Sequence, residues 1–397
     1  MPRPTLLTAA VSDPRTPVVV AARRTPVGTK GGRLSGVDVV GLASPVLSAL
    51  VGELGRVRAD VRLEVDDVVL GNCMGPGGDP ARVAALAAGL GRGVPGLTVD
   101  RQCGSGLDAI GVAARSVLAG HGIVLAGGAE SASTAPTRLA LQPDGSRRAY
   151  DRARFAPDEL GDPGMGEAAD ALAEHARVSR RRQDAYAARS HARAVAAASG
   201  GRFDAELVTV AGVDHDERPR AITEAVLSRF RPAFTRGGTV TAGNACGISD
   251  GAAAVALVPE SLRSTLGLPG LAVRAHVVSG VDPNVPGLGP VPAVRGLLEA
   301  AGLTTDDVGT FEMTEAFASQ VLACTDALGL DPLGADADRC CPDGGAIALG
   351  HPWGASGALL MVRLFATMVR SGGPRFGVAT CAVGGGQGVA TLVERVG

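Results

Sequence analysis

The sequence predicts an α/β protein made of two related halves, the first of which carries a long insertion. Short apolar runs alternate with Ala-rich segments of helical length along most of the 397 residues. Two short motifs recur in the same order in the first and second parts of the chain. Between them lies a stretch that is richer in Arg, Asp and Pro. Apolar strands that alternate with helices are typical of a sheet that is covered on both faces.

The apolar runs predict buried strands, because each is short and nearly free of polar residues. These runs are residues 17–22, 65–70, 122–126, 253–258, 272–278 and 376–379. Ala-rich helices are expected at residues 39–54, 81–90, 106–119, 166–199, 291–301 and 315–328. Strands without a polar face predict a mostly parallel sheet.

An internal repeat supports the two halves. Asp66-Asp67-Val68 precedes one apolar strand, and Asp306-Asp307-Val308 precedes another. Further along each half, a Ser-Gly pair opens an Ala-rich helix that is followed by a strand and a glycine cluster; the pairs are Ser105-Gly106 and Ser356-Gly357. The same motifs in the same order favour a duplicated unit over chance.

The repeat and the change in composition predict the domain organisation. The first half is expected at residues 17–130 and 233–258, and the second half at residues 259–397. Residues 131–232, with long polar helices and turns, are expected to form an inserted loop domain over the main fold. The residues before 17 are expected to be a flexible lead-in.

Composition excludes several classes of protein. A chain with 46% hydrophobic and 20% charged residues is too apolar to be disordered. A formal charge of −2 creates no global field for nucleic acid or anionic lipid, so neither is expected as a partner. No apolar run reaches the roughly 20 residues of a membrane helix, and no signal peptide is evident. Seven cysteines without a Cys-x-x-Cys motif favour reduced thiols in the cytoplasm.

Three glycine-rich clusters carry the candidate chemistry. In the first, Cys103 stands before Gly104-Ser105-Gly106, at the expected start of a helix. Unpaired N–H groups and positive potential at a helix start favour a thiolate, so Cys103 is a candidate nucleophile. The alternative is a buried cysteine that only packs. The adjacent pair Cys340-Cys341 has no His or second Cys pair at ligand spacing, so no metal site is expected.

The other two clusters lie in the second half. His351 is flanked by Gly350 and Pro352 in a glycine-dense turn before a helix, which suits a positioned base or an oxyanion donor. The third cluster, residues 381–388, follows a strand and contains three consecutive glycines that begin at Gly384. Three glycines could bind a phosphate, but neither the G-x-G-x-x-G motif nor the G-x-x-x-x-G-K-[ST] motif is present there. The alternative role is a backbone N–H that holds an oxyanion.

These clusters, in this order, resemble the thiolase family, and the resemblance extends from Val18 to Gly388. It includes collinear segments at residues 18–28, 127–131, 165–170, 231–234, 238–245 and 289–293. It implies a five-layered αβαβα fold of two related halves with an inserted loop domain that holds coenzyme A. It also implies a homodimer or homotetramer, acyl-CoA and coenzyme A as substrates, and no permanently bound cofactor.

The resemblance also implies roles for single residues. Cys103 matches the nucleophile that accepts the acyl group as a thioester, and His351 matches the histidine that activates it. Gly384 matches a backbone donor of an oxyanion hole. The residues that match the substrate-binding wall are Phe317 beside the acyl group, Met165, Ala242 and Cys246 beside the pantetheine arm, and Arg220, with Arg218, near the CoA phosphates.

The sequence departs from the family pattern at two catalytic positions. Thr314 stands where the family has an asparagine that holds an oxyanion-hole water. Ala382 stands where the family has the cysteine that removes the α-proton, and Cys381 is one place earlier. Neighbouring strand residues point to opposite faces, so Cys381 is expected to miss the pocket unless a bulge reorients it. Cys246 replaces a serine, and Asp100 and Asp343 replace asparagines.

The functional prediction is an acyl-CoA acyltransferase of the thiolase type that makes or cleaves a 3-ketoacyl-CoA. A first alternative is a thiolase-like acyltransferase with altered carbon–carbon chemistry that passes its acyl group to an amine, an alcohol, a carrier protein or water. A second is an inert scaffold that binds coenzyme A or a partner. Cys103 and His351 argue against the scaffold, whereas Thr314 and Ala382 decide between the other two.

Overall fold

The computed structural model describes residues 5–57 and 64–397 of the chain. In these residues, strands of one mixed sheet run in the order β11-β12-β13-β10-β2-β9-β6-β4-β5, with β1 beside β10 and β3 beside β9. The strands are β1 (Thr5–Thr8), β2 (Pro17–Arg24), β3 (Gly28–Thr29), β4 (Asp67–Gly71), β5 (Leu97–Val99), β6 (Val124–Ser131), β9 (Ser249–Pro259), β10 (Gly270–Gly280), β11 (Thr310–Met313), β12 (Phe376–Val383) and β13 (Gln387–Val396). A separate hairpin joins β7 (Arg138–Leu141) and β8 (Arg147–Tyr150).

The sheet is mixed, so the expectation of a mostly parallel sheet is wrong. Only β4 with β5, β4 with β6 and β11 with β12 pair in parallel among the described strands. The long central strands pair antiparallel because β12 returns directly into β13 through Gly384, Gly385 and Gly386. A hairpin of this kind forces antiparallel pairing, and the φ angles of 82° and 77° at Gly385 and Gly386 favour glycine there.

Two similar halves meet at the pairing of β10 with β2. On one side the order is β2-β9-β6-β4, and on the other it is β10-β13-β12-β11, with antiparallel pairs first and a parallel pair at the end of each. Each repeated Asp-Asp-Val motif lies just before or at the start of the last of these strands. The arrangement agrees with the predicted duplication.

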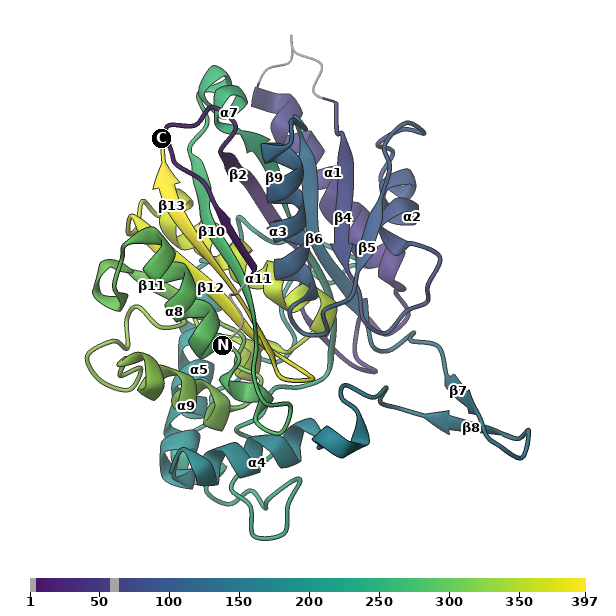
Figure 1. The fold of residues 1–397 in the computed structure, drawn as a ribbon, viewed down its shortest axis with the longest axis vertical. Coiled ribbons are helices and arrows are strands. Elements are labelled where there is room, and N and C mark those ends of the chain that lie inside the picture. Colours follow the sequence, from purple (N-terminus) through teal and green to yellow (C-terminus); the bar gives the residue numbers. More distant parts are fainter. Residues whose placement is uncertain (1–4, 58–63) are drawn as a thin grey trace.

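Two central helices separate the halves: α3 (Ser105–Leu118) and α11 (Trp353–Phe365), which lie between the two parts of the sheet in Figure 1. The repeated Ser-Gly motifs lie at the first turns of these two helices, and the close contact between the turns explains why glycine stands there. A Cβ atom at Gly106 would lie 2.7 Å from the Gly354 carbonyl oxygen, and one at Gly357 would lie 2.5 Å from the Leu107 nitrogen. The helix starts approach so closely that only glycine fits, and this brings the ends that carry the candidate residues together.

Outer helices complete the layers. α1 (Val39–Val57) and α2 (Pro80–Ala87) share a hydrophobic core with the first half of the sheet. α8 (Pro290–Ala301) and α9 (Ala318–Leu328) do the same on the second half. A third core surrounds α3 and α11, which gives the five αβαβα layers. α1 is the one described helix long and apolar enough to cross a membrane by length and composition, and it buries Leu42, Val46, Leu50 and Leu54 inside this fold.

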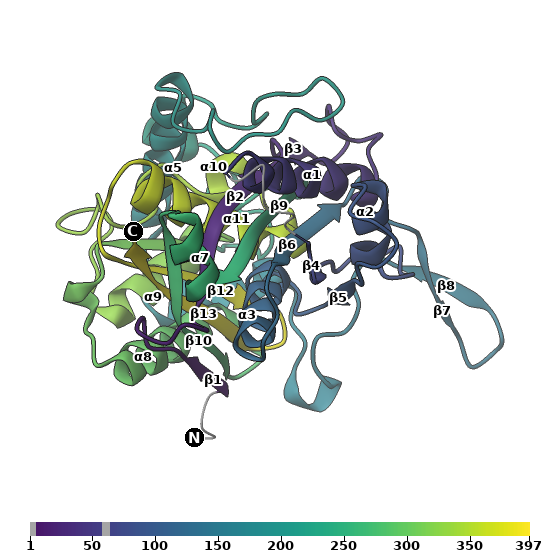
Figure 2. The ribbon, with the colours of Figure 1, turned by 90° about the horizontal axis from the view of Figure 1, so that it is seen from above.

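The segment between β6 and β9 carries the hairpin and three helices, α4 (Met165–His175), α5 (Arg180–Ser199) and α6 (Glu224–Leu227). The single helix expected at residues 166–199 is therefore two. Arg177, with a φ angle of 54°, ends the first, and the Ser179 side chain accepts from the Arg182 N–H to cap the second. The β7–β8 hairpin projects away from the body in both views (Figures 1 and 2).

Short elements complete the described chain. They are α7 (Glu260–Leu266), α10 (Ala346–Leu349), the 3₁₀ turns Asp158–Leu160, Pro286–Leu288 and Thr305–Asp307, and a π-helical turn at Ala366–Arg370. The helix expected at residues 315–328 begins only at Ala318, because Phe317 is extended, with a φ angle of −145°. The preceding residues Thr314 to Phe317 thus form a connection at the edge of the sheet, where the candidate site lies.

Candidate active site

Cys103 lies in a strained turn directly before α3. Gln102, the residue before it, has a φ angle of 45°, which is uncommon for a residue other than glycine. The turn is held by the Asp100 carboxylate, which accepts from the Gln102 N–H at 2.8 Å, and by the Ser105 hydroxyl, which accepts from the Arg101 N–H at 2.7 Å. The predicted helix start is confirmed, and the partly exposed Cys103 is fixed at the end of the central helix pair.

His351 is buried between α10 and α11 and has one free ring nitrogen. Its Nδ1 lies 2.6 Å from the Ser356 hydroxyl, and its backbone N–H donates to the Gly247 carbonyl at 2.9 Å. Its Nε2 is buried and has no hydrogen-bond partner within the described chain. Burial lowers the pKa of His351 to about 4, so the imidazole is neutral at pH 7. With the proton on Nδ1 and donated to Ser356, Nε2 has a free lone pair that can accept another.

Three thiols lie near one another, those of Cys103, Cys246 and Cys381. Burial of the Cys103 thiol raises the pKa of Cys103 well above its usual value, and the neighbouring Cys246 and Cys381 thiols raise it further. The positive potential of the α3 start does not outweigh this burial. The expectation of a thiolate at the helix start is therefore wrong. Cys103 rests as a neutral thiol and needs a base to become a nucleophile.

The third glycine cluster packs against the turn of Cys103. A Cβ atom at Gly104 would lie 2.8 Å from Val383 Cγ2, which places Gly384 beside the same turn. In the part of the chain that the structure describes, the backbone N–H groups of Cys103 and Gly384 donate to no oxygen. Two free N–H groups next to a thiol form a suitable site for an oxyanion.

Cys381 and Ala382 point to opposite faces of β12. The pairing with β13 continues without a register shift, with Cys381 opposite Val389 and Ala382 opposite Gly388. The bulge that would reorient Cys381 is therefore not found in these paired, fully described strands. The Cys381 thiol is completely buried among the residues of the central core, 3.0 Å from the Thr314 hydroxyl and close enough to the Cys103 thiol to raise its pKa, whereas Ala382 is partly exposed.

Contacts connect the segments of three predicted binding residues, Cys246, Phe317 and Met165, beside this centre. The Cys246 N–H donates to the Ala316 carbonyl at 2.9 Å, next to Phe317. The Phe317 ring meets Phe234 edge to face at 5.9 Å between centroids, and Phe234 in turn covers Gly166, which follows Met165 at the start of α4. Ala242 is exposed and precedes Cys246 by four residues on the same segment.

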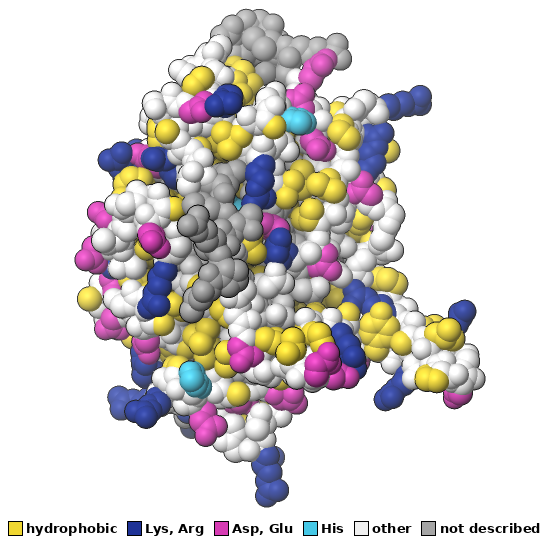
Figure 3. Space-filling view, viewed as in Figure 1, with side chains coloured by type: hydrophobic (Ala, Val, Ile, Leu, Met, Phe, Trp, Pro, Cys, Tyr) yellow, Lys and Arg dark blue, Asp and Glu magenta, His cyan; other side chains and the backbone are white. Residues whose placement is uncertain are grey.

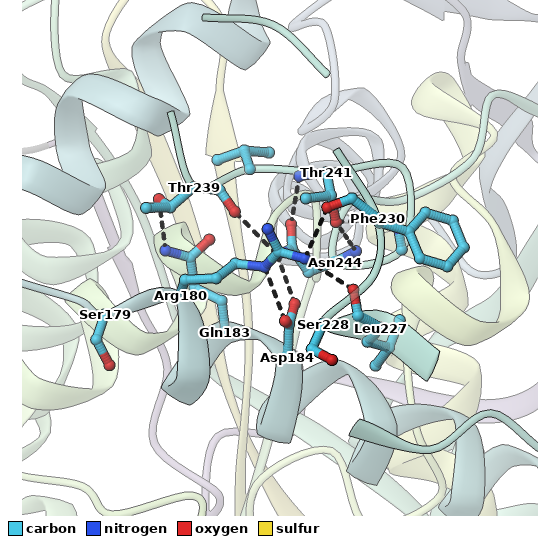
Figure 4. Close-up of polar contacts among 12 residues, drawn as sticks. Ser179, Arg180, Gln183, Asp184, Leu227, Ser228, Phe230, Thr239, Thr241 and Asn244 are labelled. Carbon is cyan, nitrogen blue, oxygen red and sulfur yellow. Dashed lines mark hydrogen bonds and ion pairs between the residues drawn. The ribbon is translucent and has the colours of Figure 1, made fainter. Parts of the chain in front are cut away.

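A polar network anchors the segment that carries Ala242 and Cys246 (Figure 4). The Asn244 side chain accepts from the Thr241 N–H at 2.8 Å and donates to Asp184 of α5 at 3.0 Å. Asp184 also pairs with Arg180, which donates to two backbone carbonyls of residues 227–230. Because Asn244 bonds both its own turn and a helix of the insertion, the segment is held against α5 by buried hydrogen bonds.

Comparisons with known proteins agree with this architecture. The family model for the N-terminal thiolase domain matches residues 17–261, and that for the C-terminal thiolase domain matches residues 268–395. The chain belongs to the thiolase family. A putative acetyl-CoA C-acetyltransferase of Bacillus subtilis is 42% identical over 383 residues, which covers 95% of this chain and 98% of that one. A β-ketoadipyl-CoA thiolase of Escherichia coli is 41% identical over 400 residues, covering 94% and 98%.

A solved structure extends the likeness to three dimensions. The crystal structure of the Bacillus anthracis acetyl-CoA acetyltransferase matches with a TM-score of 0.86 and 38% identity, and covers 96% of this chain and 99% of that one. The predicted family and fold are therefore confirmed. The chain is therefore an acyltransferase of the thiolase type, and acyl-CoA thioesters are substrates that fit this family.

Two buried glutamates position the thiolase site, and sequence reasoning did not single out either. Glu315 accepts from the Tyr186 hydroxyl at 2.8 Å and from the Ser190 hydroxyl at 2.6 Å, and it also accepts from the Ile347 N–H just before His351. Burial raises its pKa, and these hydrogen bonds oppose the shift. Glu130 accepts from the N–H groups of Cys73, Met74 and Gly354 and so ties β6 to the start of α11. Their positions in the sequence could have indicated them, since Glu130 lies in the segment 127–131 that resembles the family and Glu315 directly follows Thr314.

Phe155 is a third residue that sequence reasoning missed. A Cβ atom at Gly384 would lie 2.7 Å from the Phe155 ring, so this side chain of the insertion covers the glycine cluster. The Arg152 guanidinium lies over the same ring, with Cζ 4.9 Å from the ring centroid. No group of three or more His, Cys, Asp or Glu side chains that could hold a metal occurs among residues 5–57 and 64–397.

Proposed function

We propose that this thiolase carries its acyl group on Cys103 and makes or cleaves 3-ketoacyl-CoA thioesters. One observation carries the assignment: the turn that holds the Cys103 thiol packs against the end of β12 next to Gly384, and the backbone N–H groups of Cys103 and Gly384 are unbonded within the described chain. The unbonded Nε2 of His351 supplies the base that a neutral thiol requires. Neither feature serves the stability of the fold, since unpaired polar groups near the interior cost free energy.

The loading step uses only these groups. His351 Nε2 takes the proton of the Cys103 thiol, and the sulfur attacks the carbonyl carbon of the acyl-CoA thioester. The N–H groups of Cys103 and Gly384 hold the oxyanion of the tetrahedral intermediate. When this intermediate collapses, the carbon–sulfur bond to coenzyme A breaks, and His351 returns its proton to the departing thiolate. The acyl group remains on Cys103 as a thioester.

The second step transfers the acyl group to a carbanion of a second acyl-CoA, or to coenzyme A in the direction of cleavage. Relatives named acetyl-CoA acetyltransferase and β-ketoadipyl-CoA thiolase support this reaction. Ala382 has no group that can remove an α-proton, and Cys381 faces Thr314. That observation supports the second candidate, acyl transfer to an amine, an alcohol, a carrier protein or water. We therefore expect loading to be faster than carbon–carbon bond formation.

The substrate would lie along the strip of Met165, Ala242, Cys246 and Phe317, with Arg220 at the phosphates of coenzyme A and no resident cofactor. A homodimer or homotetramer in the cytoplasm remains part of the proposal. Leu139 and Leu141 on the projecting hairpin are 53% and 74% exposed, and Arg138, Arg147 and Arg148 stand on the same two strands. Hydrophobic and basic side chains gather on this projection in Figure 3, which supports contact with a second copy.

The test is acylation followed by thiolysis. Incubation with acetyl-CoA or a longer acyl-CoA should add one acyl mass to the peptide that contains Cys103, and Cys103→Ser should abolish the addition. Cleavage of acetoacetyl-CoA by free coenzyme A would support the thiolase reaction. Acylation without cleavage would support transfer to another nucleophile. Acylation of a different cysteine in Cys103→Ser, or none in the wild type, would refute the assignment.

A further inference from the structure

Three basic side chains next to the site have no acidic partner: Arg218, Arg220 and His191. Within the described residues none of them makes a hydrogen bond or an ion pair. Arg218 is half-buried with a fully buried, unbonded Nε, and His191 is 1% exposed with an unbonded Nδ1. Arg220 is exposed. Buried donors without acceptors are uncommon in folded proteins, and a cluster of them points to a missing ligand with acceptor oxygens.

The Arg218 guanidinium lies on the backbone of the catalytic segment. A Cβ atom at Gly247 would lie 2.3 Å from Arg218 Cζ and 2.3 Å from Nη1, so the guanidinium occupies the space that a side chain at residue 247 would take. Gly247 also accepts the backbone N–H of His351, and Cys246 precedes it. The Arg218 guanidinium therefore lies beside Gly247, which follows Cys246 in the sequence and is hydrogen-bonded to the backbone of His351.

The acidic neighbours in sequence are engaged elsewhere. Asp216 pairs with Arg24 at 2.7 Å and accepts from the Val27 N–H. Glu217 accepts from the N–H groups of Thr29 and Arg33. The positive charge of Arg218 is therefore not balanced by the residues beside it.

The other groups that face this cation do not balance it either. Burial raises the pKa of the Cys246 thiol to about 12, so this thiol is neutral at pH 7. Burial, with the charges of Arg220 and Arg218, lowers the pKa of His191 to about 4, so this imidazole is a neutral donor or acceptor. A bound anion would supply the missing charge.

We infer that Arg218, with His191 beside it, is a subsite for a carboxylate at the far end of the acyl group. The preferred substrates are then CoA thioesters of dicarboxylic acids. A guanidinium binds a carboxylate through two parallel, charge-assisted hydrogen bonds, which a neutral acyl chain cannot form. The inference rests on the proposed function, because it needs the acyl group near Cys103.

The place of Arg218 favours an acyl carboxylate over a phosphate of coenzyme A, which offers the same anionic oxygens. The Cys246 thiol beside Arg218 is close enough to the Cys103 thiol to raise its pKa. The diphosphate of coenzyme A is separated from the thioester by the whole pantetheine arm. Arg220, exposed and two residues further along, fits the phosphates better.

The experiment compares matched acyl-CoA pairs on four proteins. Rates of Cys103 acylation are measured with glutaryl-CoA against pentanoyl-CoA and with adipyl-CoA against hexanoyl-CoA. The proteins are the wild type, Arg218→Gln, Arg220→Gln and Arg181→Gln, an exposed arginine of α5 that serves as the control. Binding of the same thioesters to Cys103→Ala, and to this variant with Arg218→Gln, is measured by calorimetry. The binding measurement does not depend on turnover.

The wild type should prefer at least one dicarboxylic member by about tenfold or more. Arg218→Gln should lower kcat/KM for that member by about 10- to 100-fold, the usual range for a lost charge-assisted bond, and leave the neutral partner within about twofold. Arg220→Gln should weaken both members equally, and Arg181→Gln neither. An equal loss for both members in Arg218→Gln that disappears with pantetheine thioesters would assign the site to a phosphate and overturn the inference.

A wild type without preference at either chain length, in acylation and in binding, would also overturn it. Failure of the proposed function is a separate result, because no thioester would then acylate Cys103. The binding preference measured on the Cys103→Ala background would still decide for or against the subsite. Melting temperatures of the variants exclude a general loss of the fold.

Discussion

The protonation state of Cys103 predicts an unusual pH dependence for its reaction with an alkylating agent. Burial, with the nearby Cys246 and Cys381 thiols, raises the pKa of Cys103 well above its usual value, and no charged imidazole opposes this. Only the thiolate reacts with iodoacetamide. The alkylation rate should therefore follow the small thiolate fraction across the accessible pH range.

The magnitude follows from the two pKa values. A thiol whose pKa lies far above the assay range gains tenfold in thiolate for each pH unit, so alkylation should rise about 100-fold from pH 6 to pH 8. His351, with a pKa of about 4, carries a proton in only about one molecule in a thousand at pH 7. Acylation by acyl-CoA, in which this neutral base removes the proton, should change much less over the same range.

The assay is stopped-time mass spectrometry of the Cys103 peptide with iodoacetamide, and with acyl-CoA, at five pH values between 6 and 8. His351→Ala should keep the tenfold slope for alkylation but slow acylation by about 10²- to 10⁴-fold, the usual contribution of a general base. A plateau in alkylation between pH 6 and pH 8 would show a preformed thiolate–imidazolium pair, and the reasoning from burial would be refuted.

Three further predictions concern other parts of the molecule. Ala382→Cys should raise the rate of acetoacetyl-CoA thiolysis by about 10²- to 10⁴-fold, because it restores an acid/base on the exposed face of β12. Cys381→Ala should change this rate little, and a loss of thiolysis in Cys381→Ala would show that Cys381 is the acid/base. Ser356→Ala should slow Cys103 acylation about tenfold with KM nearly unchanged, since it frees the His351 ring, and an unchanged rate would leave Ser356 without a role in positioning. Gly106→Ala should lower the free energy of unfolding by about 1–3 kcal/mol, since its Cβ would lie 2.7 Å from a backbone oxygen. Gly55→Ala, with nothing within 4 Å, should not destabilise, and equal melting temperatures for the two variants would count against the tight helix contact.

Much of the fold could be predicted from local patterns. The alternation of apolar strands and Ala-rich helices and the repeated motifs indicated two α/β halves. The glycine clusters drew attention to Cys103, His351 and Gly384, and the order of these clusters along the chain, which resembles the thiolase family, gave the three residues their roles. The direction of the strands escaped this reasoning, because buried parallel and antiparallel strands are equally apolar, and only the chain path through the Gly384 turn decides between them.

The charge state of the site was not accessible from the sequence. A cysteine at a helix start predicted a thiolate, but the folded chain encloses the sulfur and places two further thiols beside it. The isolation of Arg218 is a second case, since Asp216 and Glu217 precede it in sequence and only the structure directs both to other partners. Sequence determines which groups are present and their local geometry. Burial and electrostatic pairing depend on residues far apart in the chain. The tertiary structure alone therefore decided that Cys103 is a neutral thiol and that the charge of Arg218 has no acidic partner among the described residues.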